Sequence, residues 1–234
     1  MKLLLTSSGI RNESINDALV DLLDKPIAEA SALCIATGMY PFQGGPAGAY
    51  RFITGKTATP LAGLGWKSLG VLELTALPSV KRENWVADVE AADALLVWGG
   101  DVFYLCRWMR ESGLAELLPT LPNIVYVGTS AGAMVTAPIF GETYDDADVP
   151  FVIDTGLGLV DFALLPHMDE VDHPESSAQN VERMAAQVPV PTYGIDDETA
   201  IKVVDGTVEV ISEGHWQLFP KVRAASGPRA DTGS

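Results

Sequence analysis

Short apolar runs alternate with segments of helical spacing along the first half of the chain. The runs cover residues 2–6, 32–37, 70–74, 94–98 and 124–127. Each is a continuous run rather than an alternation of apolar and polar residues, which is typical of parallel strands buried on both faces. Apolar residues recur at helical spacing in residues 12–23, 86–91 and 102–118. The last of these segments contains Gly113 as an interior break. This order predicts a three-layer α/β/α fold around a mostly parallel sheet.

The pattern differs in three other parts of the chain. Residues 200–204 and 208–211 flank Asp205-Gly206, and this arrangement predicts a β-hairpin. Residues 38–63 combine glycine, proline, alanine and threonine with weak periodicity, so we expect a loop-rich crossover there. Residues 224–234 are small and polar, and we expect a flexible tail after a single domain over residues 1–223.

Charge and composition narrow the possible partners. The 234 residues include 31 acidic and 15 basic side chains, a net charge of −16 that disfavours nucleic acid and anionic membrane surfaces. No apolar run reaches the length needed to span a bilayer, and the first residues lack the apolar stretch of a secretory signal. We therefore expect a cytoplasmic protein, a monomer or homodimer, in which Cys34 and Cys106 are buried free thiols.

The segment Gly128-Thr129-Ser130-Ala131-Gly132 is the strongest candidate for catalytic chemistry. A predicted strand precedes it, and a segment that can open a helix, residues 131–137, follows it. A strand–serine–helix turn of this kind is the nucleophile elbow of serine hydrolases, in which small neighbours tolerate a strained backbone that exposes the hydroxyl. The alternative is a plain helix N-cap at Ser130.

A second glycine-rich turn could stabilise negative charge beside this serine. Gly99 and Gly100 follow the predicted strand 94–98, where their backbone N–H groups could point into a site. Together with the amide of Ala131 they would form an oxyanion hole. The alternative is an ordinary turn capped by Asp101.

A nucleophilic serine needs a base and an acid. His167 follows the apolar run 162–166, so it stands at a strand end, where α/β sheets place their sites. His173 and His215 lie in polar segments and are expected at the surface, although the chain order keeps His215 as an alternative base. The histidines are too scattered for a zinc site. Spacing alone does not choose among the candidate acids Glu142, Asp145, Asp146, Asp148 and Asp169.

Four blocks of sequence occur together in one order. They cover residues 96–105 with 110–114, 128–133, 157–167 and 193–200. Over roughly residues 94–204 the chain thereby resembles the dipeptidase E (aspartyl dipeptidase) family of serine peptidases, with cyanophycinase as a more distant relative. The resemblance implies a flavodoxin-like fold akin to class I glutamine amidotransferases, with serine in place of their cysteine, and no cofactor.

The resemblance also implies roles for particular residues. Ser130 would be the nucleophile, His167 the base and Asp145 the acid, with Asp146 and Glu142 as alternatives for the acid. The donors of the oxyanion hole would be Gly99, Gly100 and Ala131.

Substrate recognition is where the chain departs from this family. The aspartyl dipeptidases of this family recognise an N-terminal aspartate through an arginine in the segment after the catalytic histidine. In this chain the corresponding segment, residues 168–175, is acidic. The first arginine is Arg183, and Asn180 lies nearer the expected position. Asp101, Asn180 and Arg183 are therefore the candidates for substrate binding.

The function expected from the sequence is hydrolysis of short peptides by an exopeptidase or dipeptidase through an acyl-enzyme on Ser130. A preference for N-terminal aspartate is left open. One alternative is an esterase of the α/β-hydrolase type, although the chain lacks a His-Gly-Gly-Gly block and His167 follows the serine closely. Another is a catalytically inert, amidotransferase-like binding domain.

Overall fold

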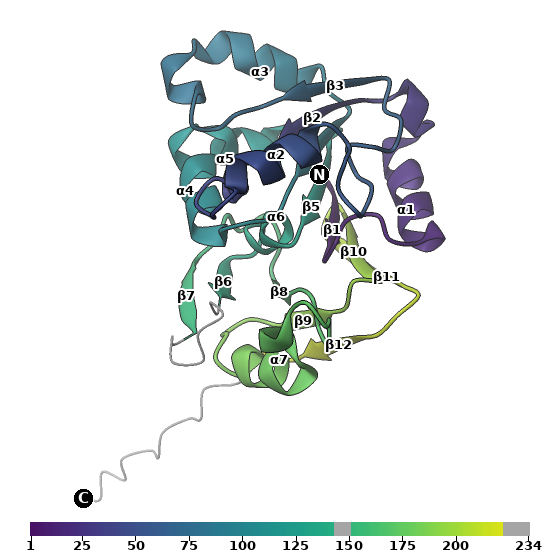
Figure 1. Ribbon diagram of the computed structural model, residues 1–234, viewed down its shortest axis with the longest axis vertical. Helices are drawn as coiled ribbons and strands as arrows, with labels where there is room; N and C mark the ends of the chain where they lie inside the picture. The colour runs from purple at the N-terminus through teal and green to yellow at the C-terminus, as the bar shows by residue number, and fades with distance from the viewer. Residues whose placement is uncertain (143–150, 222–234) are drawn as a thin grey trace, which may run out of the picture.

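A seven-stranded sheet forms the centre of the computed structural model, which describes residues 1–142 and 151–221 (Figure 1). Its strands are, in spatial order, β11 (Thr207–Ser212), β10 (Thr199–Val204), β1 (Lys2–Thr6), β5 (Val125–Thr129), β4 (Ala94–Val97), β2 (Ser31–Ile35) and β3 (Ser68–Val71). The five strands from β1 to β3 are parallel, while β10 and β11 form the predicted antiparallel hairpin. The mostly parallel sheet expected from the apolar runs is confirmed.

Helices cover both faces of this sheet. They are α1 (Glu13–Leu23), α2 (Gly45–Ile53), α3 (Arg82–Glu90), α4 (Val102–Glu111), α5 (Leu114–Leu117) and α6 (Ala131–Met134). Successive residues of a strand point to opposite faces. Leu4 of β1 accordingly packs with α1 and α2, whereas Leu3 and Leu5 pack with α3 to α6. The predicted three-layer α/β/α arrangement is confirmed.

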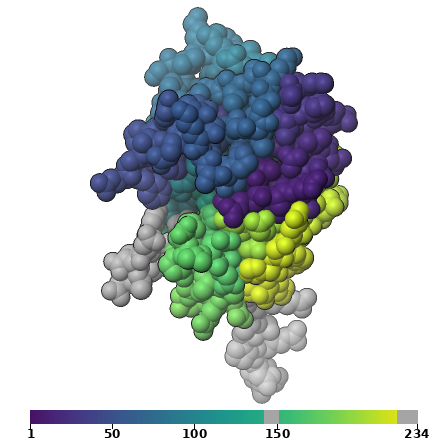
Figure 2. Space-filling model, turned by 45° about the vertical axis from the view of Figure 1, so that its right-hand side comes forward, coloured from purple at the N-terminus to yellow at the C-terminus, as the bar shows by residue number. Residues whose placement is uncertain are grey.

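Two smaller sheets lie beyond one end of the central sheet. The first joins β12 (Trp216–Phe219), β9 (Thr192–Ile195) and β8 (Ala163–Leu165), with α7 (Ala178–Ala185) packed on it; the second pairs β6 (Ile139–Glu142) with β7 (Val152–Thr155). Figure 2 shows α7 and the last strands as green and yellow surfaces below the purple and blue N-terminal part. Short 3-10 turns occupy Ile27–Glu29, Thr37–Met39, Leu77–Ser79, Leu118–Thr120 and Pro174–Ser176.

The structure corrects two expected segments. The crossover at residues 38–63 contains α2, because a glycine at its N-cap and a proline in its first turn start a helix that buries Ala49 and Phe52. The Phe52 ring stacks on Trp98, with centroids 4.6 Å apart. The helix expected at 102–118 divides into α4 and α5 at Gly113, whose φ of 80° is incompatible with a continuous helix.

The tail expected at residues 224–234 lies outside the described part of the chain. Among residues 1–142 and 151–221, none of the helices is long and apolar enough to cross a membrane.

Tyr126 connects the central sheet to the turn that follows β5. Its side chain is fully buried, and its hydroxyl donates a 2.6 Å hydrogen bond to the carbonyl oxygen of Gly132. We expect Tyr126→Phe to lower the free energy of unfolding by about 1–3 kcal/mol, because that carbonyl would lose its partner in a buried position. Urea denaturation measures the loss. Tyr50→Phe is the matched control, since Tyr50 is 61% exposed; equal stabilities of the two variants would contradict the prediction.

Candidate active site

Ser130 occupies a sharp turn between β5 and α6. Its φ of 52° and ψ of −119° lie in a region that residues with a side chain rarely adopt. Hydrogen bonds hold this backbone on both sides: its N–H donates to the carbonyl of Thr6 at 3.0 Å, and its carbonyl accepts from Ala133 at 2.8 Å and Met134 at 2.9 Å. The predicted strand–serine–helix turn is therefore present, with a strained residue at its apex.

Small residues around Ser130 are required by close packing. A Cβ atom added to Gly99 would lie 3.0 Å from the Cβ and 3.4 Å from the Oγ of Ser130. Gly100 has a φ of 125°, and a Cβ there would lie 2.2 Å from the carbonyl oxygen of Gly38. The structure thus brings the Gly99-Gly100 turn against the serine, next to Ala131 at the start of α6. Their role as oxyanion donors stays a prediction.

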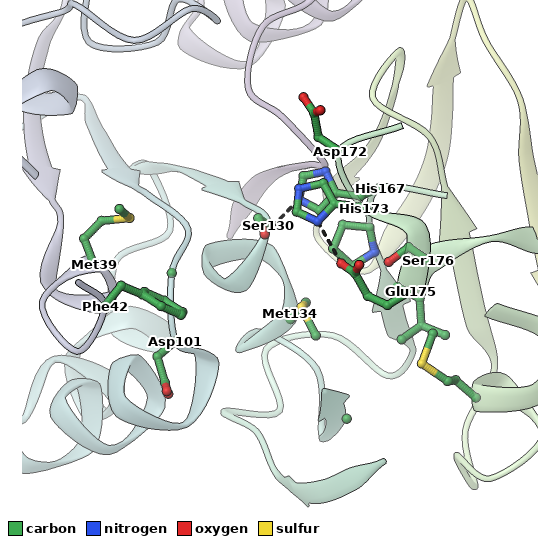
Figure 3. A pocket seen from close by; sticks show the side chains of 15 residues that line it. Met39, Phe42, Asp101, Ser130, Met134, His167, Asp172, His173, Glu175 and Ser176 are labelled. Carbon is green, nitrogen blue, oxygen red and sulfur yellow. Dashed lines mark hydrogen bonds and ion pairs between the residues drawn. The ribbon is translucent and has the colours of Figure 1, made fainter. Parts of the chain in front are cut away.

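His167 stands two residues beyond the end of β8, as the apolar run predicted. Its Nε2 atom lies 3.0 Å from the Oγ of Ser130 (Figure 3). The backbone of His167 also has a positive φ, 60°, and its N–H donates to the Oγ of Ser7 at 2.6 Å. Since Ser7 directly follows β1, the central sheet positions both the serine and the histidine.

The carboxylate beside His167 belongs to Asp197, which the sequence analysis did not select. Its Oδ1 lies 2.8 Å from the Nδ1 of His167, and both side chains are 12% exposed. The predicted acid, Asp145, and the alternatives Asp146 and Asp148 lie outside the described residues, and Glu142 ends β6. Among the described residues, the contact with Nδ1 that the prediction assigned to Asp145 is made by Asp197.

Strand pairing explains why Asp197 meets His167. Strand β8 is parallel to β9, with Leu165 opposite Gly194, so both strands end at the same edge of their sheet. His167 and Asp197 follow those two ends. The signal for this acid in the sequence is the acidic pair that directly follows the apolar residues of β9, Asp196 and Asp197. The predicted acids all lie before the histidine or within two residues of it.

The surroundings of Asp197 keep it ionised. Burial raises the pKa of this carboxyl, but the hydrogen bond and charge of His167, with smaller contributions from Ser8 and Arg11, bring the pKa below its ordinary value of 3.8. Because the folded-state pKa is lowered, the stabilising contact with His167 is present at neutral pH and is lost as the pH falls through that pKa.

The other two histidines have different surroundings. His215 contacts Asp196 through Nδ1 at 2.9 Å and Asp169 through Nε2 at 3.2 Å, so it is His167 rather than His215 that contacts the serine. His173 was expected at the surface. Its side chain is 42% exposed, yet its ring stacks on His167, with centroids 4.0 Å apart and planes at 12°.

A cavity of about 350 Å³ opens in front of Ser130. In Figure 3, Met39, Phe42 and Asp101 lie on one side of it and His173, Glu175 and Ser176 on the other. Its lining residues are Met39, Phe42, Gly100, Asp101, Ser130, Met134, Gly141, Leu165, Pro166, His167, Asp172, His173, Glu175, Ser176 and Met184. A small pocket with apolar walls and a few polar groups beside a serine suits a small organic substrate.

The structure brings only one of the three predicted substrate-binding residues to this pocket. Asp101 lines it and also caps α4, accepting a 2.8 Å hydrogen bond from the N–H of Tyr104. Asn180 and Arg183 lie on α7, outside the lining, where the exposed guanidinium donates to the Oδ1 of Asn180 at 2.9 Å. The prediction that these two residues reach the substrate therefore has no support in the described pocket.

The sequence predicted two buried free thiols and no zinc site. Cys34 and Cys106 are free and buried, as expected, and burial raises the pKa of the Cys34 thiol to about 12. Within residues 1–142 and 151–221, no group of histidine, cysteine and acidic side chains is arranged to hold a metal ion.

Several known proteins are similar to this chain. Peptidase E of Escherichia coli O6:K15:H31 (strain 536) is 30% identical over 174 residues, which cover 70% of this chain and 68% of that protein. Peptidase E of Nostoc sp. is 28% identical over 141 residues, which cover 56% of this chain and 57% of that protein. An uncharacterized peptidase of Pasteurella multocida is 30% identical over 129 residues, which cover 53% of this chain and 61% of that protein. The match thus spans less than two thirds of the length of the last two relatives.

Solved structures share the fold. A peptidase from an acI-B1 Actinobacterium has a TM-score of 0.65 at 20% identity, covering 95% of each chain. A protein from Listeria monocytogenes EGD-e has a TM-score of 0.62 at 20% identity, covering 91% of this chain and 98% of its own. The model of peptidase family S51 matches residues 3–211. The chain therefore belongs to peptidase family S51, and the resemblance to the dipeptidase E family is confirmed.

Proposed function

We propose that the protein is a serine peptidase that hydrolyses short peptides through an acyl-enzyme on Ser130. The observation that carries this proposal is the line of contacts from Asp197 through His167 to the serine, at 2.8 and 3.0 Å. A nucleophile, a base and an orienting acid within hydrogen-bond reach are the requirements of acyl transfer by serine. Membership of a peptidase family supports a peptide as the acyl donor.

In the proposed reaction, His167 transfers a proton twice. Its Nε2 takes the proton of the Ser130 hydroxyl as Oγ attacks the peptide carbonyl, and then gives that proton to the departing amine. Asp197 accepts a hydrogen bond from Nδ1–H and stabilises the imidazolium cation. In the second transfer, water attacks the acyl-enzyme while His167 takes its proton, and His167 returns that proton to the Oγ of Ser130 as the acid product leaves.

Backbone N–H groups beside the serine would stabilise the oxyanion that forms on the carbonyl. We assign this role to the amide of Ala131 and to the turn of Gly99 and Gly100, as the sequence indicates. The contact of the turn with Ser130 supports this assignment. Positioned donors of this type account for about 3–4 kcal/mol of transition-state stabilisation each.

The pocket supports a short substrate, because a cavity of about 350 Å³ accommodates one or two residues rather than a folded protein. A preference for N-terminal aspartate, which the sequence leaves open, has no lysine or arginine to support it among the described lining residues. It stays a prediction, which a substrate panel tests.

Covalent labelling tests the proposed function. We expect a fluorophosphonate probe to add to Ser130, as identified by peptide mass spectrometry, because His167 activates that hydroxyl. Labelling should abolish hydrolysis of aminoacyl p-nitroanilides and unblocked dipeptides. Ser176 also lines the pocket and serves as the internal control, which should remain unlabelled. Ester turnover without peptide cleavage would favour the esterase alternative, and no labelling with no turnover would favour the inert binding domain.

A further inference from the structure

The loop between β8 and α7 folds back on its own first part. The carbonyl oxygen of His167 accepts a 3.1 Å hydrogen bond from the N–H of Glu170, and the carbonyl oxygen of Glu170 accepts one of 3.0 Å from His173. Further along, the carbonyl oxygen of Ser176 accepts a 3.0 Å bond from the N–H of Asp169. These backbone contacts hold the loop closed and bring the side chain of His173 back onto that of His167.

His173 and Glu175 form a second histidine–carboxylate pair in the site. The Nδ1 of His173 lies 2.9 Å from the Oε1 of Glu175, and both residues line the cavity in front of Ser130. Because an ionised carboxylate can only accept a hydrogen bond, Nδ1–H is the donor. The other oxygen, Oε2, is buried without a partner among the described residues, so this bond is what holds the His173 ring to its neighbour. The proposed reaction gives neither residue a role.

The ring of His173 restrains a motion that the catalytic contacts leave free. His167 contacts Asp197 and Ser130 through two atoms at the edge of its ring, Nδ1 and Nε2. Contacts at these two atoms do not prevent the ring from turning about the line that joins them. His173 lies against the face of the same ring, with centroids 4.0 Å apart and planes at 12° (Figure 3). A ring packed face to face opposes that rotation, because turning would break the stacking.

We infer that His173 is a positioning residue for catalysis: its ring holds the imidazole of His167 in the orientation in which Nε2 reaches the Oγ of Ser130. Glu175 in turn holds the ring of His173. This inference rests on the proposed peptidase function and adds to it a residue outside the triad. A turned imidazole takes the proton of the hydroxyl less effectively, whereas peptide binding does not depend on its orientation. The effect therefore falls on kcat rather than on KM.

Two substitutions at His173 separate the stacking from the bond to Glu175. His173→Asn removes the ring but keeps a side-chain N–H group that can donate to Glu175. His173→Phe keeps a ring that can stack on His167 but removes the donor. We expect kcat for aminoacyl p-nitroanilides to fall about five- to tenfold in His173→Asn, the effect of one aromatic pair, and to stay within about twofold of the wild type in His173→Phe. KM should change by less than about twofold in both variants.

Two further measurements distinguish positioning from a purely structural role. The rate of inactivation by a fluorophosphonate does not require a bound peptide, and it should fall in His173→Asn by the same factor as kcat. Unfolding temperatures should follow the opposite order. His173→Phe should be the less stable variant, because it leaves a partly buried carboxylate without its donor. Loss of activity in the more stable variant assigns the defect to the missing ring.

Glu175→Ala tests the same inference without altering either ring. It frees the side chain of His173, so we expect a loss of kcat in the same direction but smaller, about two- to fivefold. His215→Asn is the matched control for the substitution of histidine by asparagine. His215 also contacts carboxylates, those of Asp196 and Asp169, but it is His167 that contacts the serine. Its kcat should stay within about twofold of the wild type.

The outcomes separate this inference from the function on which it rests. Wild-type kcat in His173→Asn, or an equal loss in His173→Asn and His173→Phe, would overturn the inference and leave the peptidase function standing. A change confined to KM would also overturn it, because His173 would then contact the substrate instead. Absence of turnover by the wild-type protein, or turnover that does not depend on Ser130, would contradict the proposed function as well.

Discussion

Ser130→Ala is expected to lower kcat for aminoacyl p-nitroanilides and dipeptides by about 10⁶-fold, the loss seen when the nucleophile of a serine peptidase is removed. Without Oγ no acyl-enzyme forms, and the histidine has no hydroxyl to activate. Steady-state kinetics with chromogenic substrates measures the loss. The variant should also fail to react with a fluorophosphonate.

The same substitution should leave the fold unchanged. Alanine keeps the Cβ atom of serine, so the strain at a φ of 52° is the same in both proteins. The hydroxyl of Ser130 contacts His167 and is not an N-cap donor or acceptor for α6. An unfolding temperature close to that of the wild type, together with the loss of turnover, identifies a chemical defect. Unchanged turnover would exclude Ser130 as the nucleophile.

Asp197→Asn is expected to reduce kcat by about 10⁴-fold with little change in KM. An amide in this position can no longer stabilise the imidazolium that forms on His167, and it favours the wrong tautomer of the ring. The pH dependence adds a second readout. Because the pKa of Asp197 lies below its ordinary value of 3.8, the wild-type carboxylate is ionised at neutral pH, and its protonation should not reduce wild-type activity until the pH falls below 3.8.

Two further variants test whether the loss of activity is specific to Asp197. Asp145→Asn should leave kcat within about twofold of the wild type, because the geometry gives the orienting role to another acid. Asp169→Asn alters a second contact between an aspartate and a histidine, that of Asp169 with His215 at 3.2 Å, which lies apart from the serine. A large loss in Asp145→Asn with an active Asp197→Asn would return the acid to the position expected from the sequence.

Local signals accounted for most of the layered fold and for two site residues. Continuous apolar runs identified four buried parallel strands of the central sheet, but the run at 70–74 overlaps only the end of β3, which is mostly exposed. An Asp-Gly turn identified the hairpin of β10 and β11. Small residues between a strand and a helix identified Ser130, and an apolar run ending in Pro-His identified His167. These features depend on side chains within a few positions of one another.

Helix α2 and the division of the helix at Gly113 were harder to predict from the sequence. The segment around α2 has a composition typical of turns, and its helix is stabilised by contacts such as the stacking of Phe52 on Trp98. Tertiary packing of this kind overrides weak local propensity. The glycine that seemed tolerable inside one long helix has a positive φ that ends it.

The sequence by itself therefore determined the layered α/β architecture, the serine and its histidine, because each is encoded by neighbouring residues. Only the tertiary structure decided which carboxylate contacts His167, the stacking of His173 on His167 and the charge of the pocket. Asp197 reaches His167 because β8 and β9 pair in parallel and end at one edge. The acidic lining is assembled from residues as distant as Asp101 and Glu175. Contacts between remote segments arise only when the chain folds, and no local pattern specifies them.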